Sequence, residues 1–440
     1  MDFMNVKIQR FDQLPPQLIL IPKQMETRSF PMQITLSLGT WRKRMKVQFT
    51  EKLNKDVIGL SSQLYPELTI PEHLPYEIKL QQSNLLLGPI IGMIIARREI
   101  TEDMFEEFEP YLKNYQKLNG IIYLCAESGI DPQKKTIQGF YYNPDAVEES
   151  PWTEGVFPYP GAVYRRVLLT DRIYYDLARE VRGKIFNSYL FNKYEMWNVL
   201  SKVPSIHKYL PETAVLRGID NLDDMLRRYE SVYLKPVFGG YGLGIVKVDK
   251  MPNGYRLFDG HTIDKHFTEL SEMEEFIQPL EKQYYIVQQA VPLTFDHRHV
   301  DFRLILQKDK SRTWKSSGML ARFGRIEKVY TNEVSNVTMG YEALMEIFSL
   351  TREEAFQKEK EITDLCIEAS RLLEQYYAGY GDYADFGIDV IVDQGQRIWL
   401  LEVNKFHEHD VGLLVDSDTG LYERIVTTPL EYVKALAGFR

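Results

Sequence analysis

A lysine and a glycine-rich loop adjoin each other in KPVFGGYGLGIVKV, residues 235–248. The backbone N–H groups of such a loop can approach phosphate oxygens, and a lysine just before it adds positive charge at the same place. Glycines also serve tight turns that need positive φ, so the loop alone is compatible with either role. The loop glycines are Gly239, Gly240, Gly242 and Gly244.

The residues after the loop exclude two common phosphate sites. A dinucleotide-binding fingerprint needs a helix after its glycines, whereas residues 245–248 (IVKV) are short, β-branched and alternating. A P-loop ends in Gly-Lys-Ser/Thr, which is absent here. The pattern of strand, glycine loop and strand instead predicts a hairpin lid over phosphates, with Lys235 beside them.

A second group of chemically interesting residues lies in DFGIDVIVDQGQRIWLLEVN, residues 385–404. Two apolar strands flank a Gln-Gly turn, which predicts a hairpin. In the expected register Asp389 lies opposite Leu400 and forms a diagonal pair with Glu402, about 7–8 Å apart at Cα. Asn404 shares their face. Carboxylates in such apolar strands are costly unless they are paired or bind metal, and oxygen ligands suit Mg²⁺. The hairpin therefore predicts a magnesium site, with a salt-bridged or solvent-facing pair as the alternative.

The composition is that of an ordinary globular protein. The 440 residues include 53 Lys and Arg against 62 Asp and Glu, and the net charge of -9 argues against broad attraction to nucleic acid or anionic lipid. Cys125 and Cys366 lie in apolar sequence and are expected to be buried free thiols, which suits a reducing compartment. The most apolar stretch, residues 85–96, is too short to span a bilayer, and no signal peptide is expected.

Several elements must position these residues. Short alternating runs predict a small β-rich module over residues 1–85, and the apolar run and strand that come after it predict an α/β unit. A helix is expected from Thr101 to Gly120. The clearest helix is predicted over 351–377, where apolar side chains recur at three- and four-residue spacing.

In their order along the chain, these pieces resemble the ATP-grasp superfamily, in which two α+β subdomains clamp ATP. The resemblance covers residues 190–410 and implies an α+β fold with a lid subdomain at 191–290 and a magnesium-binding subdomain at 291–440. An α/β pre-grasp domain at 86–190 precedes them. The elements that carry the resemblance are Lys193, Lys235, the glycine loop, Gln288-Gln289, Asp301-Phe302-Arg303, Asp389 and Glu402-Val403-Asn404.

The resemblance implies a role for each of these elements. Lys193 and Lys235 are similar to the lysines that contact the ATP phosphates, and the glycine loop is similar to the mobile lid. Arg303 resembles the arginine that steadies the transferred phosphate, and Arg322 is a further candidate. The remaining expected ligands are Gln288, Gln289, Ala290, Val291 and Asp301 for the nucleotide, and Asp389, Glu402 and Asn404 for Mg²⁺, with Mn²⁺ as an alternative ion.

Within the superfamily, the chain is similar to the YheC/YheD group of endospore coat-associated proteins over residues 86–440. The phrases that indicate this are LGPIIGMI, FPYPGAVYRRV, and GMLARFGR followed by TNEVSNVTMG. The chain departs from the group in two places. Where relatives continue the Glu-Val-Asn motif with small residues, proline and glycine, it has KFHEHDVG, and Met339-Gly340 stands where a glycine pair is common.

The resemblance implies carboxylate activation: a carboxylate attacks the γ-phosphate of ATP, and an amine or thiol then displaces phosphate from the acyl-phosphate. The implied partners are ATP, a carboxylate and amine substrate, and spore coat proteins, but no nucleic acid. The implied location is the cytoplasm or the spore coat. An ATP-binding structural or regulatory coat component without ligase turnover stays open, and the altered segment 405–410 favours it.

Two other interpretations have less support. His407 and His409 could suggest a metal site, but a pair on an exposed loop without a third soft ligand is expected to be unrelated to metal. Residues 385–387 spell Asp-Phe-Gly, but no His-Arg-Asp catalytic loop precedes them, which excludes a protein kinase.

Overall fold

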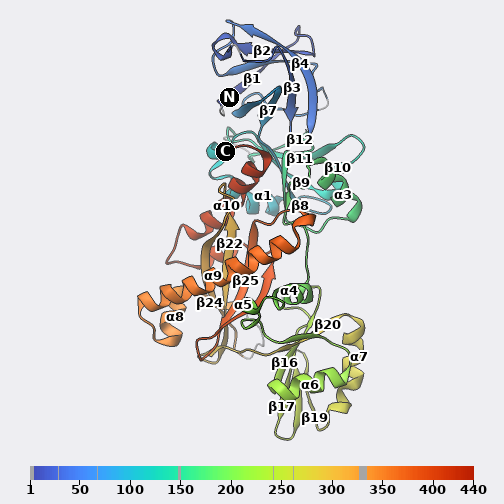
Figure 1. Ribbon diagram of the computed structural model, residues 1–440, viewed down its shortest axis with the longest axis vertical. Helices are drawn as coiled ribbons and strands as arrows, with labels where there is room; N and C mark the ends of the chain where they lie inside the picture. Colours follow the sequence, from blue (N-terminus) through green and yellow to red (C-terminus); the bar gives the residue numbers. More distant parts are fainter. Residues whose placement is uncertain are drawn as a thin grey trace.

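The computed structural model describes residues 4–27, 29–66, 68–146, 150–240, 242–260, 262–326 and 334–440. Four sheet-containing parts succeed one another along the long axis of the molecule (Figure 1). The N-terminal part lies at one end and the sheet that carries the glycine loop lies at the other. The C-terminus returns to the N-terminal half of the molecule, beside the second part.

The first part is a closed β-barrel, in the strand order β1-β5-β2-β4-β3-β7-β6. Pairing of β1 with β6 closes it, so the barrel has no free strand edge. The last strand ends at Gly88, just before the apolar run that begins the next part. The strands are β1 (Met4–Phe11), β2 (Leu18–Pro22), β3 (Gln33–Leu38), β4 (Trp41–Thr50), β5 (Val57–Ser61), β6 (Tyr76–Gln81) and β7 (Asn84–Gly88).

The second part is a mixed sheet in the order β10-β11-β9-β8-β13-β14, with β12 paired to β11. Its central strands β8 and β9 are parallel and fully buried, as expected for strands covered on both faces. The strands are β8 (Ile90–Ala96), β9 (Ile121–Ala126), β10 (Ile130–Asp131), β11 (Thr136–Tyr142), β12 (Trp152–Pro158), β13 (Ala162–Arg165) and β14 (Ile185–Phe186). The helices are α1 (Glu102–Phe108), η2 (Glu109–Leu112), α2 (Tyr115–Leu118) and α3 (Asp171–Glu180).

The third part is a sheet in the order β15-β20-β16-β17-β18-β19, in which every pair of neighbours is antiparallel. Two helices bury their apolar stripes against it, and the glycine loop joins β16 to β17. The strands are β15 (Thr213–Val215), β16 (Ser231–Pro236), β17 (Val246–Met251), β18 (Gly254–Phe258), β19 (Asp264–Phe267) and β20 (Tyr285–Gln289). The helices are α6 (Ile219–Tyr229) and α7 (Glu274–Lys282).

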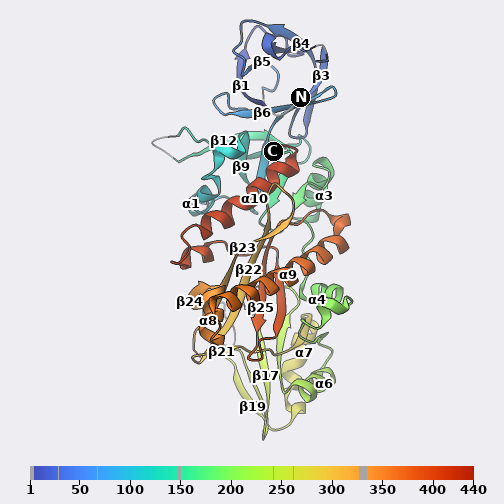
Figure 2. The ribbon, with the colours of Figure 1, turned by 60° about the vertical axis from the view of Figure 1, so that its left-hand side comes forward.

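The fourth part is an antiparallel sheet in the order β24-β23-β22-β25-β26, with β21 paired to β22. The long helix α9 packs on one face of this sheet, and α10 leaves the other face to reach the second part (Figure 2). The strands are β21 (Thr294–Phe295), β22 (Arg298–Lys308), β23 (Trp314–Gly324), β24 (Val334–Met339), β25 (Asp385–Val392) and β26 (Ile398–Asn404). The helices are α4 (Lys193–Leu200), α5 (Pro204–His207), α8 (Gly340–Phe348), α9 (Arg352–Tyr376), η6 (Asp410–Leu414) and α10 (Leu421–Ala437).

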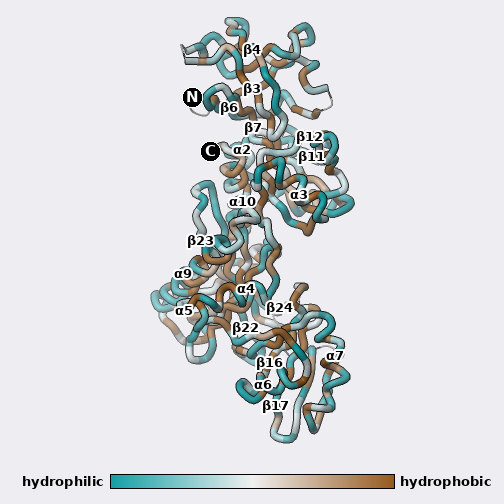
Figure 3. The backbone as a smooth tube through the Cα atoms, turned by 45° about the vertical axis from the view of Figure 1, so that its right-hand side comes forward, coloured by the Kyte–Doolittle hydropathy of each residue, from teal (hydrophilic) through white to brown (hydrophobic). Residues whose placement is uncertain are grey.

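Two helix predictions had different outcomes. The helix expected over 351–377 is confirmed as α9, which begins with a capping box between Thr351 and Glu354. Hydrophobic and hydrophilic segments alternate along it, as a helix with one buried stripe requires (Figure 3). The prediction of a single helix from Thr101 to Gly120 is wrong, because this segment forms three short helices. It is divided into α1, η2 and α2, and Pro110, which cannot donate a backbone hydrogen bond, lies at the first break.

The expected free thiols are confirmed, because Cys125 and Cys366 are both buried and unpaired. None of the helices in the described part of the chain is both long and apolar enough to cross a membrane. The exact boundaries at residues 85, 190 and 290 stay predictions.

Candidate active site

A cavity of about 420 Å³ lies between the third and fourth parts, under the glycine loop. Both sheets contribute to its lining. Strand β16 and the glycine loop contribute Lys235, Gly239, Gly240 and Gly242, and β20 contributes Gln288 and Gln289. Strands β22, β23, β25 and β26 contribute a set of six polar side chains that we call the charged floor: Asp301, Arg303, Arg322, Asp389, Glu402 and Asn404.

The alternation of side chains along the strands explains the charged floor. In β22, Phe302 and Leu304 belong to the apolar core shared with α9, so Asp301 and Arg303 must lie on the opposite face. In β25, Ile388 and Val390 belong to the same core. The pattern of single polar residues between apolar ones thus places the charged residues of several strands on one face.

The expected register of the β25–β26 hairpin is wrong. Asp389 is paired directly with Glu402, and Val390 with Leu400, because the register shifts between Asp389 and Val390. The shift leaves Leu401 as an extra residue, a β-bulge, and Leu401 and Glu402 both line the cavity. The bulge therefore brings the two carboxylates closer together than the predicted diagonal pair would be.

Asp389 is the most highly connected residue of the charged floor. It accepts hydrogen bonds from Arg303 Nε at 2.5 Å, from Arg322 Nη2 at 3.1 Å and from Asn404 Nδ2 at 3.2 Å. Arg322 also makes a bidentate pair with Asp301, at 2.7 Å for each bond. Although burial by itself would raise the pKa of Asp389, the two guanidinium groups hold it below its ordinary value. Asp389 is therefore an ionised oxygen donor.

The two predicted lysines face the charged floor, Lys193 from the start of α4 and Lys235 from β16. Lys193 Nζ lies 3.2 Å from Glu402 Oε1 and donates to the carbonyl oxygen of Gly239 at 2.7 Å, so it joins the floor to the glycine loop. Lys235 Nζ donates to Gln288 Oε1 at 2.7 Å. Burial lowers the pKa of Lys235, Glu402 opposes the shift and Lys193 adds to it, and the result is a pKa of about 8.

The charges of this region suit an anionic ligand together with a divalent cation. Four cations (Lys193, Lys235, Arg303 and Arg322) surround three carboxylates (Asp301, Asp389 and Glu402) within one cavity. Two of the carboxylates and the Asn404 amide supply the oxygen donors that Mg²⁺ prefers. The residues present therefore fit Mg²⁺ with polyphosphate better than they fit a neutral ligand.

Two of the predicted nucleotide-binding residues do not line the cavity. Gly244 has φ of +75°, and a Cβ there would lie 2.7 Å from Tyr285 Oη, so its role is conformational. Ala290 donates its backbone N–H to Ser231, whereas Val291 lines the cavity. Tyr241, within the loop, and residues 331–333 of the TNEVSNVTMG phrase lie outside the described residues.

The cavity has one further boundary, which we call the 406–414 wall and which includes part of the altered segment 405–410 that the sequence analysis singled out. It comes directly after the Glu-Val-Asn motif and consists of Phe406, His407, Glu408, Asp410, Val411, Leu413 and Leu414. Leu413 and Leu414 are more than half exposed. Glu408 and Asp410 are exposed too, and among the described residues neither makes an ion pair. This wall is thus acidic and apolar, in contrast to the two lysines that face the charged floor.

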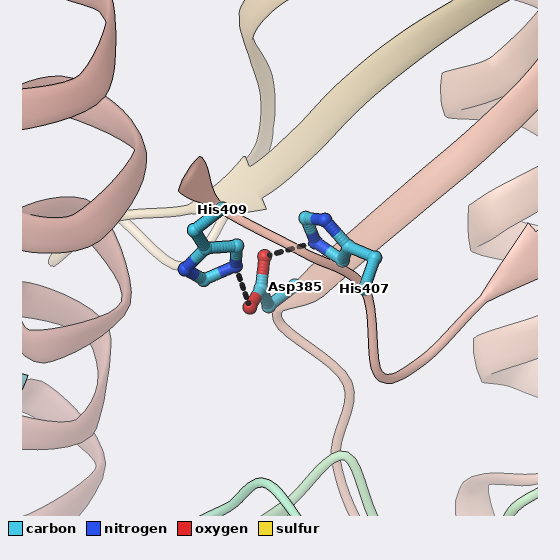
Figure 4. A group of neighbouring side chains, drawn as sticks. All are labelled: Asp385, His407 and His409. Carbon is cyan, nitrogen blue, oxygen red and sulfur yellow. Dashed lines mark hydrogen bonds and ion pairs between the residues drawn. The ribbon is translucent and has the colours of Figure 1, made fainter. Parts of the chain in front are cut away.

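His407 and His409 do not lie on an exposed loop, contrary to our expectation. Both are buried, and their Nε2 atoms each lie 3.0 Å from a different oxygen of Asp385, which is fully buried (Figure 4). The expectation was wrong because contacts with Tyr111 and Arg166, more than 240 residues away along the chain, cover the segment. No local sequence pattern indicates such contacts.

The possible ligand atoms of Asp385, His407 and His409 lie within 4.8 Å of one another, as a metal site would require. However, the possible ligand atoms are already paired with one another and with Arg166: each histidine Nε2 lies 3.0 Å from an oxygen of Asp385, and Arg166 Nη1 lies 3.2 Å from His409 Nε2. Burial lowers the pKa of His409 to about 3, so its ring is neutral. We interpret the group as hydrogen-bonded without a metal.

Comparison with known proteins agrees with this arrangement. The family model "YheC/D like ATP-grasp" matches residues 182–436, which is more than half of the chain. The chain belongs to the YheC/D-like ATP-grasp family. Its relatives include the endospore coat-associated protein YheD of Bacillus subtilis (strain 168), 24% identical over 389 residues, which cover 84% of this chain and 83% of YheD. YheC of the same organism is 21% identical over 271 residues, which cover 58% of this chain and 72% of YheC.

Among solved structures, the ATP-grasp ligase PsnB in complex with its precursor peptide PsnA2 and AMPPNP is 13% identical, with a TM-score of 0.45. The match covers 80% of this chain and 98% of PsnB. Membership of the YheC/D-like ATP-grasp family confirms the predicted α+β ATP-grasp fold.

Proposed function

We propose that this YheC/D-like ATP-grasp protein is an ATP- and Mg²⁺-dependent ligase that joins a carboxylate to an amine, in connection with the endospore coat. The observation that carries the proposal is the charged floor beneath the glycine loop, where four cations and three carboxylates line one cavity. The link to the spore coat rests on the names of the relatives YheD and YheC.

Each residue of the site has a physical task in this reaction. ATP with Mg²⁺ supplies a phosphoryl group for transfer and charge neutralisation at the phosphates. Asp389, Glu402 and Asn404 hold the cation, and Lys193 and Lys235 bind phosphate oxygens. Arg303 and Arg322, which belong to the charged floor and donate to Asp389, bind the carboxylate substrate and the anionic acyl-phosphate formed from it.

The glycine loop excludes water. Gly239, Gly240 and Gly242 line the cavity, so the loop can cover the phosphates with its backbone N–H groups. Covering the site limits hydrolysis of the acyl-phosphate before the second substrate attacks. No side-chain nucleophile is needed.

The 406–414 wall favours an amine over a thiol as the second substrate. Glu408 and Asp410 make no ion pair among the described residues and therefore offer their carboxylates to a cationic group at the cavity edge. Leu413 and Leu414 add exposed apolar surface beside them. An amine with an apolar part is complementary to this combination.

The proposal is tested by incubating the protein with Mg-ATP and pools of amino acids or short peptides and measuring ADP release. We expect release with at least one pool, and a loss of about 10²–10³-fold in turnover for Glu402→Gln, since one charged ligand of the cation is removed. The alternative is an ATP-binding structural or regulatory coat component. Saturable ATP binding that is unaffected by Glu402→Gln, with no ADP release from any pool, would contradict the ligase and support that alternative.

A further inference from the structure

A buried polar network lies directly behind the 406–414 wall, and the proposed chemistry does not use it. Its centre is Asp385, which is fully buried. Besides the two histidines, Asp385 accepts hydrogen bonds from Tyr164 Oη at 2.7 Å and from Gln307 Nε2 at 2.8 Å. Burial alone would raise the pKa of Asp385, but the two histidines hold it well below its ordinary value, so the network is centred on a buried negative charge.

The network joins the wall to the second part of the molecule. Tyr111 of η2 pairs its hydroxyl with His409 Nδ1 at 2.7 Å, and Arg166, just after β13, donates to the carbonyl oxygen of His407 at 2.8 Å. Asn187, after β14, donates to the carbonyl oxygen of Lys405 at 2.6 Å. Side chains from three places in the second part therefore fix both the backbone and the rings of this segment.

His407 of the same segment also packs against β25, the strand that carries Asp389 of the charged floor. A Cβ on Gly387 would lie 2.7 Å from Cγ of His407, so the imidazole occupies the space that a side chain would fill. Gly387 lies between Asp385 and Asp389 on one face of β25. The network is thus separated from the expected cation ligands by a single glycine, and a shift of the histidine would move the wall relative to Asp389.

We propose that the Asp385 network positions the 406–414 wall for the amine substrate, with Asp385, Tyr164 and Tyr111 as positioning residues. This rests on the proposed ligase function. In the productive step the amine attacks the acyl carbon, the amide C–N bond forms, the acyl–phosphate C–O bond breaks, and the departing inorganic phosphate takes up the proton that the amine loses. A wall displaced by about 1 Å misaligns the amine, and water attacks the same carbon instead. The network therefore sets how much of the ATP consumed yields amide.

The first test uses two matched tyrosine variants of the full-length chain. Tyr164 and Tyr159 are both fully buried, and each donates its hydroxyl to a carboxylate, Asp385 at 2.7 Å and Asp176 at 2.9 Å. Only Tyr164 contacts the network. Measured by hydrogen–deuterium exchange, Tyr164→Phe should make residues 403–414 exchange about five- to tenfold faster, whereas Tyr159→Phe should leave them unchanged. Affinity for Mg-AMPPNP should stay within about twofold in both variants.

The second test measures the ratio of ADP released to amide formed with the amino-acid pool. We expect this ratio to rise about three- to tenfold in Tyr164→Phe and to equal the wild-type ratio in Tyr159→Phe. A purely structural role would lower the amount of folded protein without changing the ratio. If Tyr164→Phe does not fold, Tyr111→Phe, which removes the contact with His409, takes its place in both tests.

The outcomes separate this inference from the proposed function. Wild-type protein that releases no ADP contradicts the ligase, and the exchange measurement then decides alone whether the network positions the wall. Unchanged exchange over residues 403–414 overturns the inference even if the wild-type protein is an active ligase. So does faster exchange with an unchanged ratio of ADP to amide.

Discussion

The charged floor and the 406–414 wall enclose the same cavity but are held in different ways. The floor is built from strand residues that alternate with core residues, so each side chain is directed by its own strand and its immediate neighbours. The wall is held by side chains that are far away in sequence: Tyr111 contacts His409 across 298 residues, and Arg166 contacts His407 across 241. Local geometry thus fixes the residues that we assign to phosphate binding, while contacts between parts of the molecule fix the surface that we assign to the second substrate.

The largest expected effect comes from comparing two lysines, one that lines the cavity and one that does not. Lys235 and Lys405 are both partly buried, and burial lowers the pKa of each to about 8. Lys235 lines the cavity, whereas Lys405 does not line it and instead contacts the Phe191 ring and the carbonyl oxygens of Phe191 and Val403. We expect Lys235→Met to weaken Mg-AMPPNP binding by roughly 10- to 150-fold, because a charged hydrogen bond is worth about 1.5–3 kcal/mol. Calorimetric titration measures the change.

Lys405→Met is the matched control, because it removes an equally perturbed lysine one residue from Asn404. Its affinity for Mg-AMPPNP should stay within about threefold of wild type. Similar losses in both variants would show that position in the cavity does not determine the contribution of a lysine. The residues that line the cavity and those around it would then not differ in their contribution to nucleotide affinity.

The sequence predicted the charged floor because its signals are local. Single charged residues in apolar strands marked Asp389 and Glu402. Arg303 and Asp301 were named only through the resemblance to the ATP-grasp superfamily, and in the structure strand alternation places them on the same face. The register of the hairpin was missed by one residue at Val390, which pairs with Leu400 and not with Trp399. It was missed by two residues at Asp389, because the β-bulge at Leu401 adds a further shift and has no clear sequence signature. Asp385 carried the same signal as Asp389, a carboxylate in an apolar strand, and could have been singled out for the same reason.

The wall could not be predicted in the same way. The burial of His407 and His409 depends on Tyr111 and Arg166, which contact them only because the fourth part and α10 pack against the second part of the molecule. The closed barrel at the N-terminus is a similar case. Its alternating strands were predicted as β-rich, but closure depends on the pairing of β1 with β6, which are about 70 residues apart. Pairings of this kind are set by the tertiary fold.

The two lysines should also differ in how strongly they make Mg-AMPPNP affinity depend on pH. Below about pH 8, Lys235 is a cation that attracts phosphate, and above it the side chain becomes neutral in the free protein. Mg-AMPPNP affinity should therefore fall about five- to tenfold between pH 7 and pH 9 in the wild type and in Lys405→Met, but not in Lys235→Met. A decline of equal size in Lys235→Met would assign the titration to another group.

The stability of the chain should change with pH in the opposite direction. The pKa of Lys235 is lowered from 10.5 to about 8 in the folded state, so between these values the unfolded chain binds more protons than the folded one. The free energy of unfolding should rise with pH over this window. Urea unfolding at pH 8 and pH 10 should show a smaller rise in Lys235→Met than in the wild type.

The smallest predicted effect is a difference in the free energy of unfolding between alanine substitutions at two glycines of the glycine loop. Gly244 has φ of +75° and no room for a Cβ next to Tyr285, whereas a Cβ on Gly240 would meet nothing within 4 Å. Gly244→Ala should lower the free energy of unfolding by about 1–2 kcal/mol, because a left-handed backbone disfavours any side chain. Gly240→Ala should change it by less than about 0.5 kcal/mol. Urea unfolding measures both, and equal losses would show that the strained backbone at Gly244 is not what holds the loop in its conformation.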